Sequence, residues 1–509
     1  MILFMKIEKS FAALPLFFQV FTIACSLMFA LAAYGFLIGS FGEARVFLYS
    51  SLTGFLIFAL INMATSNRNL KETGIMQLIS LLLLFILLPV FLAVPTWIIL
   101  QESSFLDAYV DMVGSITTTG LPVFENEFLS ELILLWRALI AWFGGGLIWI
   151  AAFLILLPAS LGELDVVSNK KKLNSNLTRK LTLNEQSTNL TKISKKIVPL
   201  YFGLTIILWC LLTSLGTDGY TSLIRAFSIM STSGILGPEK FESDWMGFCG
   251  EFVMAVFLLL ALSHNIFYSF NKKASLKQLK FDKEIRLGLC IVVCITLVLS
   301  FKDMRLISSN FNFENFYLSE LKLIWGNFFT AFSFLTTNGY VSAFWSRDLT
   351  SIQMPHVTII LIGLCLFGGG LATTAGGIKL LRVSVLFSAF SNETGKLLHP
   401  SSLVGSSSEL KSLRISVFMA WIFFMLFVIS LALVTIILAT FGVLFEEALV
   451  LAVACLTTTG PLIETVGIDS LLISELSYFS KLVLAISMVM GRLEILVALS
   501  VMSSALTRV

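Results

Sequence analysis

Ten long apolar stretches constrain this chain more than any other feature of its sequence. Of the 509 residues, 57% are hydrophobic and only 13% are charged, whereas soluble domains carry about 25% charged residues. So few charges cannot cover a surface that faces water, so most of the surface must face lipid. A soluble enzyme, a nucleic-acid-binding protein and a secreted disulfide-rich protein are thereby excluded. The stretches cover about 11–38, 46–64, 75–100, 132–158, 197–216, 246–270, 286–301, 355–390, 413–442 and 477–506.

The first of these stretches admits two interpretations. It follows Lys6 and Lys9, and Ala30-Leu31-Ala32 resembles the cleavage site of a signal peptide. The apolar run continues beyond that point, which favours an uncleaved membrane helix.

Four shorter apolar pieces lie between the long stretches, near 107–116, 222–230, 323–335 and 446–456. Each is too short to cross a hydrocarbon core of about 30 Å and is predicted to be a re-entrant half-helix. If the N-terminus is cytoplasmic and every half-helix enters from outside, most of the 34 Lys and Arg residues fall on the inner side, as the positive-inside rule requires. This topology also places the C-terminus in the cytoplasm and most acidic residues outside, where they would concentrate cations.

Each half-helix is followed by a similar tetrapeptide, so one structural unit occurs four times. The unit consists of a membrane helix, a half-helix, a small polar loop and a second membrane helix. One Thr-Thr-Gly sequence would indicate only a turn, but four copies in the same context indicate a shared structural and functional role. The tetrapeptides are Thr117–Gly120, Ser231–Gly234, Thr336–Gly339 and Thr457–Gly460.

Irregular backbone at membrane depth has unsatisfied carbonyl groups and is tolerated only beside protein or an aqueous path. Four such loops around one axis would place carbonyl oxygens in rings, which can replace the water shell of a monovalent cation. Glycine permits the positive φ that turns a carbonyl inward, and hard oxygen ligands without a ring of carboxylates suit K⁺ or Na⁺ better than Ca²⁺. The predicted filter residues, with K⁺ as the bound ion, are Thr118, Thr119, Gly120, Thr232, Ser233, Gly234, Thr337, Asn338, Gly339, Thr458, Thr459 and Gly460.

These four units resemble the Trk/Ktr/HKT superfamily of potassium transporters, most closely its Trk-type membrane subunit. The fourth loop continues into Pro461, as in the family's fourth filter. Gly368–Lys379 resembles the family's glycine-rich segment, and Met490–Glu494 resembles its last-helix motif. The resemblance covers nearly the whole chain. It implies an all-α integral membrane fold of four helix–pore-loop–helix repeats around one pore, plus an N-terminal helix pair.

The resemblance also implies how the chain is divided. A basic cytoplasmic connector between the first two repeats contains Lys170–Lys172 and is predicted to be flexible and solvated, with contact to anionic lipid or a partner protein as the alternative. The implied boundaries are 1–70 for the helix pair, 71–162 for repeat 1, 163–197 for the connector, 198–272 for repeat 2, 273–392 for repeat 3 with its glycine-rich intramembrane loop, and 393–509 for repeat 4.

The activity that the resemblance implies is K⁺ translocation across the bacterial inner membrane, with no cofactor besides the transported ion. It further implies a homodimer with one pore per subunit and a cytosolic nucleotide-binding regulatory subunit on the basic inner face. Ser233, Asn338 and Thr458-Thr459 replace residues that are usual in the family's filters. A Na⁺-permeable member of the same superfamily is therefore an alternative.

The glycine-rich segment is predicted to be unwound, because five glycines interrupt one apolar stretch. The resemblance places it beneath the filter as a gate, and a kink for helix packing is the alternative. Arg492 lies deep in the last stretch, where a charge costs about 2.5–3.5 kcal/mol, so it should face protein or water. The resemblance implies that Arg492 faces the pore, and a structural arginine bonded to a neighbouring helix is the alternative. The predicted gate residues are Arg492, Gly368, Gly369, Gly370, Thr373, Thr374, Gly376, Gly377 and Lys379.

Two other functions agree less well with the sequence. An alternating-access transporter for another small solute often has two inverted repeats, whereas the four repeats here face the same way. A membrane enzyme would need a cluster of His, Asp, Glu or Cys at membrane depth, and only Arg492 and Glu494 qualify there. The seven Cys and three His are scattered, so no metalloenzyme site is predicted.

Overall fold

A computed structural model describes most of the chain, and every regular element in that part is a helix. This agrees with the all-α class predicted from the sequence. The described residues are 16–65, 74–101, 103–124, 129–152, 183–237, 247–263, 282–307, 316–345, 355–371, 373–398, 407–468 and 470–493.

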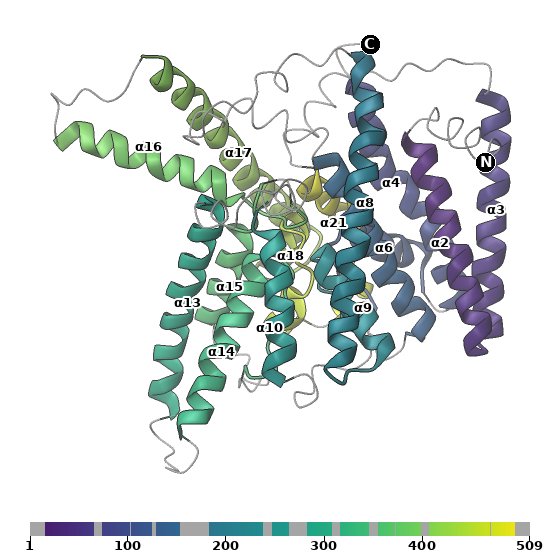
Figure 1. The fold of residues 1–509 in the computed structure, drawn as a ribbon, viewed down its shortest axis with the longest axis horizontal. Coiled ribbons are helices and arrows are strands. Elements are labelled where there is room, and N and C mark those ends of the chain that lie inside the picture. Colours follow the sequence, from purple (N-terminus) through teal and green to yellow (C-terminus); the bar gives the residue numbers. More distant parts are fainter. Residues whose placement is uncertain are drawn as a thin grey trace.

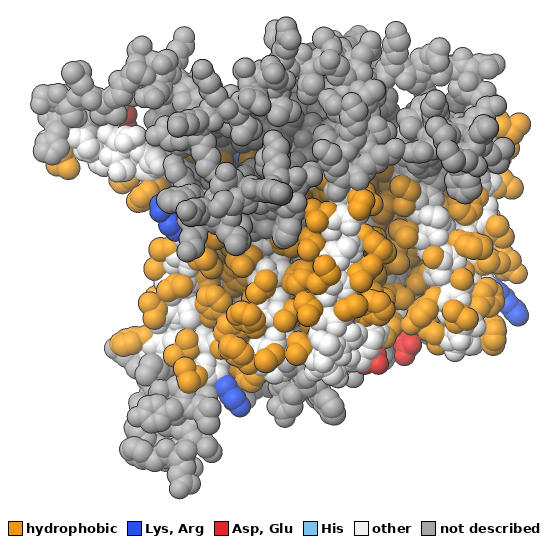
Figure 2. All heavy atoms as spheres, viewed as in Figure 1, with side chains coloured by type: hydrophobic (Ala, Val, Ile, Leu, Met, Phe, Trp, Pro, Cys, Tyr) orange, Lys and Arg blue, Asp and Glu red, His pale blue; other side chains and the backbone are white. Residues whose placement is uncertain are grey.

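Seven helices in the described part are long and apolar enough to cross a membrane. Large apolar side chains on them are exposed, such as Leu37 at 86% and Leu297 at 65%. Figure 2 shows hydrophobic side chains across the middle of one face, with the few visible charges at the margins of this band. Such a surface is solvated by lipid. The seven are α2 (Leu16–Ile38), α3 (Phe41–Thr65), α4 (Gly74–Ile99), α6 (Glu131–Ala151), α8 (Leu183–Ser214), α13 (Lys283–Ile307) and α17 (Ser407–Thr440).

The other three predicted stretches are shorter or broken where the structure describes them. The stretch predicted at 246–270 is α10 (Gly247–Leu258), extended by the 3₁₀ turn Leu259–Ala261. The stretch at 355–390 is split into α15 (Pro355–Leu366) and α16 (Leu380–Leu398), with a non-helical segment between them. The last stretch is α21 (Tyr478–Arg492), and residues from 494 onward lie outside the described part.

Four helices occupy the positions of the predicted half-helices, and each begins somewhat before its predicted start, most of all α14, which has 20 residues. They are α5 (Phe105–Ile116), α9 (Gly219–Ser231), α14 (Phe316–Leu335) and α18 (Phe445–Leu456). α14 begins at Phe316, earlier than the predicted start near 323. Ser104 caps α5 by accepting from the N–H of Asp107, and Asp218 caps α9 by accepting from the N–H of Tyr220.

Residues 183–197 also differ from the prediction. They were expected to belong to the flexible connector, but they form the first turns of α8. Leu190, Ile193 and Ile197 are spaced three and four residues apart, which is the helical period. The rest of the predicted connector, 163–182, lies outside the described residues.

Contacts between the helices join four units into a closed ring, and Figure 1 shows the molecule with α2 and α3 at its right-hand side. Within each unit the first membrane helix packs on the half-helix: α4 on α5, α8 on α9, α13 on α14 and α17 on α18. The second membrane helix of each unit then packs on the half-helix of the next: α6 on α9, α10 on α14 and α15 on α18. α21 closes the ring by packing on α5. The pair α2–α3 lies outside the ring, against α4.

Two glycines allow the membrane helices to approach the ends of the half-helices. A Cβ built on Gly144 of α6 would overlap the carbonyl oxygen of Ile116 at the end of α5. Gly491 of α21 has the same relation to Leu456 at the end of α18. Any side chain at these positions would push the half-helix and the membrane helix apart.

Candidate functional site

Each half-helix ends in the same hydrogen-bonded turn. In the first loop the N–H of Thr118 donates to Ser115 O (2.9 Å) and the N–H of Thr119 donates to Gly114 O (2.7 Å). This pair of bonds is the Schellman arrangement, which ends a helix through one residue in the left-handed conformation. The equivalent bonds in the other loops are Thr232 to Ile229 and Ser233 to Ser228, Thr337 to Phe334 and Asn338 to Ser333, and Thr458 to Cys455 and Thr459 to Ala454.

The left-handed residue is a threonine in all four loops. The φ angles are 54°, 54°, 57° and 56° at Thr118, Thr232, Thr337 and Thr458. A β-branched residue rarely adopts positive φ, and such strain costs about 1–3 kcal/mol unless the surroundings impose it. Its occurrence at four equivalent positions shows that the fold imposes it.

The four tetrapeptides touch one another in order around a ring. A Cβ on Gly120 would overlap the carbonyl oxygen of Ser233, and a Cβ on Gly234 would overlap that of Asn338. A Cβ on Gly339 would come within 3.0 Å of Pro461. The N–H of Gly460 donates to Thr119 O (2.6 Å) and closes the ring. The structure therefore brings the four tetrapeptides that contain the predicted filter residues together in one ring of contacts.

The threonine hydroxyls at the helix ends face different surroundings. Those of Thr118, Thr232 and Thr458 are buried and have no hydrogen-bond partner among the described residues. The hydroxyl of Thr337 accepts from the N–H of Gly376 (2.9 Å) in the glycine-rich segment. Buried oxygens without protein partners need another partner, such as water or a cation.

The third loop differs from the other three. In loops one, two and four, two hydroxyls bond to each other within the tetrapeptide: Thr117 with Thr119 (2.9 Å), Ser231 with Ser233 (3.1 Å) and Thr457 with Thr459 (3.2 Å). We call this bond the latch. Asn338 occupies the second latch position of the third loop, and its side-chain oxygen and nitrogen are buried without a partner in the described part of the chain.

The glycine-rich segment is folded against the ends of α14 and of the 3₁₀ turn after α10, and against the fourth loop. The N–H of Gly369 donates to Leu335 O (3.0 Å), and the N–H of Gly370 donates to Ala261 O (3.0 Å). A Cβ on Gly376 would overlap the carbonyl oxygen of Thr457. Gly368 and Gly377 are equally confined, by Thr337 and Cys365 respectively, so the segment fits only as a chain of small residues.

Polar side chains fix this segment from several sides. Arg492 donates to Thr374 O, and Lys379 donates to Ala375 O. Thr373 donates to Gly370 O (2.8 Å). Arg492 is buried, and its Nε and Nη2 have no partner among the described residues. The structure thus places the predicted gate residues together, with Arg492 bonded to the segment itself.

Glu284, at the start of α13, makes a contact that the sequence did not predict. Its carboxylate accepts from the N–H of Leu371 (2.9 Å) in the glycine-rich segment. Glu284 precedes this segment by about 87 residues in the chain, so only the folded ring brings the two together.

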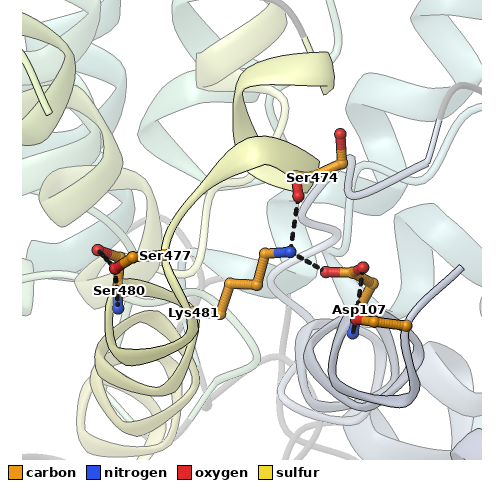
Figure 3. Close-up of polar contacts among 6 residues, drawn as sticks. Asp107, Ser474, Ser477, Ser480 and Lys481 are labelled. Carbon is orange, nitrogen blue, oxygen red and sulfur yellow. Dashed lines mark hydrogen bonds and ion pairs between the residues drawn. The ribbon is translucent and has the colours of Figure 1, made fainter.

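Two buried ion pairs hold α5 in the ring, and they too were not predicted. Lys481 of α21 pairs with Asp107 and donates to Ser474 O (2.7 Å), as Figure 3 shows. Arg137 of α6 pairs with Asp111 (2.9 Å) and donates to Leu121 O (3.2 Å), just after the first filter glycine. The signal available in the sequence was a lone charge inside an apolar stretch, which usually marks a buried partner.

Comparisons with known proteins place this geometry in a family. The family model described as TrkH, cation transport protein, matches residues 246–506. The chain is 25% identical over 421 residues to the Trk system potassium uptake protein TrkG of Escherichia coli K12, covering 82% of each chain. It is 24% identical over 400 residues to TrkH of the same strain, covering 76% of this chain and 77% of that one.

The fold is also that of a solved structure. The crystal structure of the potassium transporter TrkH from Vibrio parahaemolyticus superposes with a TM-score of 0.73 at 20% identity, covering 96% of this chain and 97% of that chain. Because the family model matches more than half of the residues, the chain belongs to the TrkH family of cation transport proteins.

Proposed function

We propose that this protein carries K⁺ across the bacterial inner membrane through the ring of four loops. The observation that carries the proposal is the closed contact of the four tetrapeptides, each at the end of a half-helix. The relatives TrkG and TrkH are named as potassium uptake proteins. As a member of a transport family, the protein is not an enzyme, and K⁺ is its cargo rather than a cofactor.

The chemistry follows from the loops. K⁺ loses its water shell on entry, and the carbonyl oxygens of the predicted filter residues replace that shell. The C-terminal ends of α5, α9, α14 and α18 add negative dipole ends that favour a cation. At the inner end, the hydroxyls of Thr118, Thr232 and Thr458, which have no partner among the described residues, supply further hard oxygens.

The glycine-rich segment would act as the gate below this filter. It is held by Arg492 on one side and by the hydroxyl of Thr337 on the other. A buried positive charge beside the ion path also repels cations. Opening therefore requires the hydrogen bond between Arg492 and Thr374 to break, so that the segment can move.

The gate proposal predicts that Arg492→Ala raises the cation flux by about tenfold, because it removes both the bond and the charge. The measurement is ⁸⁶Rb⁺ influx into proteoliposomes, with Arg45→Ala on the exposed face of α3 as the matched control. A flux equal to that of the wild type would assign Arg492 a purely structural role.

The assembly is also part of the proposal. We expect a homodimer with one pore per subunit and a cytosolic nucleotide-binding regulatory subunit at the inner face. Both termini would lie in the cytoplasm, which places most Lys and Arg residues there.

The decisive test of transport is growth rescue of a potassium-uptake-deficient bacterium at low K⁺. The wild type is expected to rescue growth, and Gly120→Asp is expected to abolish it. A side chain at Gly120 has no room beside Ser233 O and would place a carboxylate in the ring. Rescue by Gly120→Asp would remove the first loop from the filter. Na⁺ uptake without K⁺ rescue would favour the Na⁺-permeable alternative, and neither activity would favour a transporter of another solute.

A further inference from the structure

We infer that Glu251 is a positioning residue that sets ion selectivity by holding the third filter loop in place. The inference rests on the proposed function, because it assigns a role in the selectivity of the same ring. Glu251 lies in α10, the second membrane helix of the second unit, where that helix packs on α14 of the third unit.

Three donors from the third unit surround the carboxylate of Glu251. The indole Nε1 of Trp325 donates to Oε2 (2.7 Å), and the backbone N–H of Ala343 donates to Oε1 (2.8 Å). The hydroxyl of Ser342 lies 2.8 Å from Oε1 and 2.7 Å from Oε2. Every bond crosses from one unit to the next, so the carboxylate joins the two units.

This carboxylate is buried at 1% exposure. A buried charge is costly unless it is well hydrogen-bonded, and an apolar side chain of similar size often serves stability better. The contacts around Glu251 are all donors, and the ionised carboxylate is the form that accepts from every one of them. An ionisable side chain buried inside a membrane protein is therefore a candidate for a functional role.

The segment that Glu251 holds directly follows the third filter glycine. Ser342 and Ala343 are three and four residues beyond Gly339. Between them and the glycine, Tyr340 donates its hydroxyl to Ile235 O (2.8 Å) in the second loop. The segment is thus anchored to the neighbouring unit at both of its ends.

The absence of the latch explains why this loop needs an external anchor. Loops one, two and four each have a hydroxyl–hydroxyl bond inside the tetrapeptide. In the third loop Thr336 bonds only to the helix carbonyls of Phe332 and Ser333, and Asn338 has no partner among the described residues. The third loop shares the backbone turn of the other loops, but the position of its carbonyl oxygens depends in addition on Glu251 and Tyr340, which stand in for the missing latch.

The test is the K⁺ over Na⁺ flux ratio of the full-length protein in proteoliposomes. Glu251→Gln keeps the shape but turns one acceptor into a donor that faces other donors. We expect the ratio to fall by about tenfold, the loss typical of one charge-assisted hydrogen bond, while the protein remains folded. The matched control is Glu43→Gln in α3, which removes a carboxylate that accepts from Ser130 (2.9 Å) outside the ring. It should leave the ratio unchanged.

A second variant separates positioning from general destabilisation. Asn338→Thr introduces the residue that forms the latch in the first and fourth loops, so it should restore selectivity to Glu251→Gln by at least half of the loss. A purely structural role for Glu251 would lower the melting temperature without rescue by Asn338→Thr. An unchanged ratio in Glu251→Gln, with a K⁺-selective wild type, would overturn this inference alone. A wild type without K⁺ flux would overturn the proposed function.

Discussion

At the scale of single residues, the four left-handed threonines mark the place where each half-helix ends and its loop begins. Glycine would fit the same backbone without strain, yet threonine stands at all four positions. The side chain must therefore contribute something that offsets the strain. Its hydroxyl is the only polar group it adds, and three of these hydroxyls are buried without a partner in the described part of the chain.

If the hydroxyls offset the backbone strain by contacting the ion, Thr232→Gly should affect stability and transport in opposite directions. The substitution should keep or raise the melting temperature, because it relieves about 1 kcal/mol of backbone strain. It should also raise the K⁺ concentration needed for half-maximal uptake, because it removes one oxygen from the ion path. Thr232→Ser keeps the hydroxyl and is the control, with uptake close to that of the wild type. A normal half-maximal concentration in Thr232→Gly would show that the hydroxyl does not contact the ion.

At the scale of elements, α5 is fixed by charges from two of the helices that pack on it, α6 and α21. Lys481 joins it to α21 and Arg137 joins it to α6. These are the second membrane helices of the fourth and first units, so the two ion pairs stabilise the place where the chain closes its ring.

Lys481→Met should destabilise the protein by about 3–5 kcal/mol, because it leaves the buried Asp107 without its cation. Thermal unfolding in detergent measures this loss. Adding Asp107→Asn removes the stranded charge, so the double variant should recover much of the stability. If the double variant is less stable than Lys481→Met, the pair does not act as a pair.

The elements also show what the sequence could predict. Apolar length predicted the membrane helices, and the four tetrapeptides predicted the repeated unit, since both signals are local. The start of α14 at Phe316 and of α8 at Leu183 was missed, because polar residues in these turns obscured the helical period. The contacts of Glu251, Glu284 and Asp111 were missed because their partners lie far away in the sequence or in other helices. A single sequence does not show which residues of two helices face each other. The roles of the filter and gate residues stay predictions.

At the scale of the whole molecule, the ring is held at its centre by few direct bonds between loops. The bond from Gly460 to Thr119 closes it, and the bond from Tyr340 to Ile235 joins loops two and three. The proposed function requires carbonyl oxygens of the four loops to point at a common axis, where they would repel one another unless a cation lies among them. A bound ion should therefore stabilise the fold as well as pass through it.

The melting temperature should accordingly rise with K⁺ concentration at constant ionic strength maintained with choline. An ion that binds only the folded state adds about 2.7 kcal/mol at one hundred times its dissociation constant. Gly120→Asp is the control, and its melting temperature should not respond to K⁺ in the same way. Equal melting temperatures in K⁺ and choline would argue against an ion site in the folded ring.

The hydrogen bond from Gly376 to Thr337 joins the glycine-rich segment to the one filter loop that lacks a latch. When the segment moves, that loop loses a hydrogen bond that the corresponding threonines of the other three loops do not make among the described residues. Coupling between two sites is reciprocal, so a change in the loop must also affect the position of the segment. The species of ion resident in the ring would bias how often the path below is clear, so permeation and opening would form one coupled equilibrium.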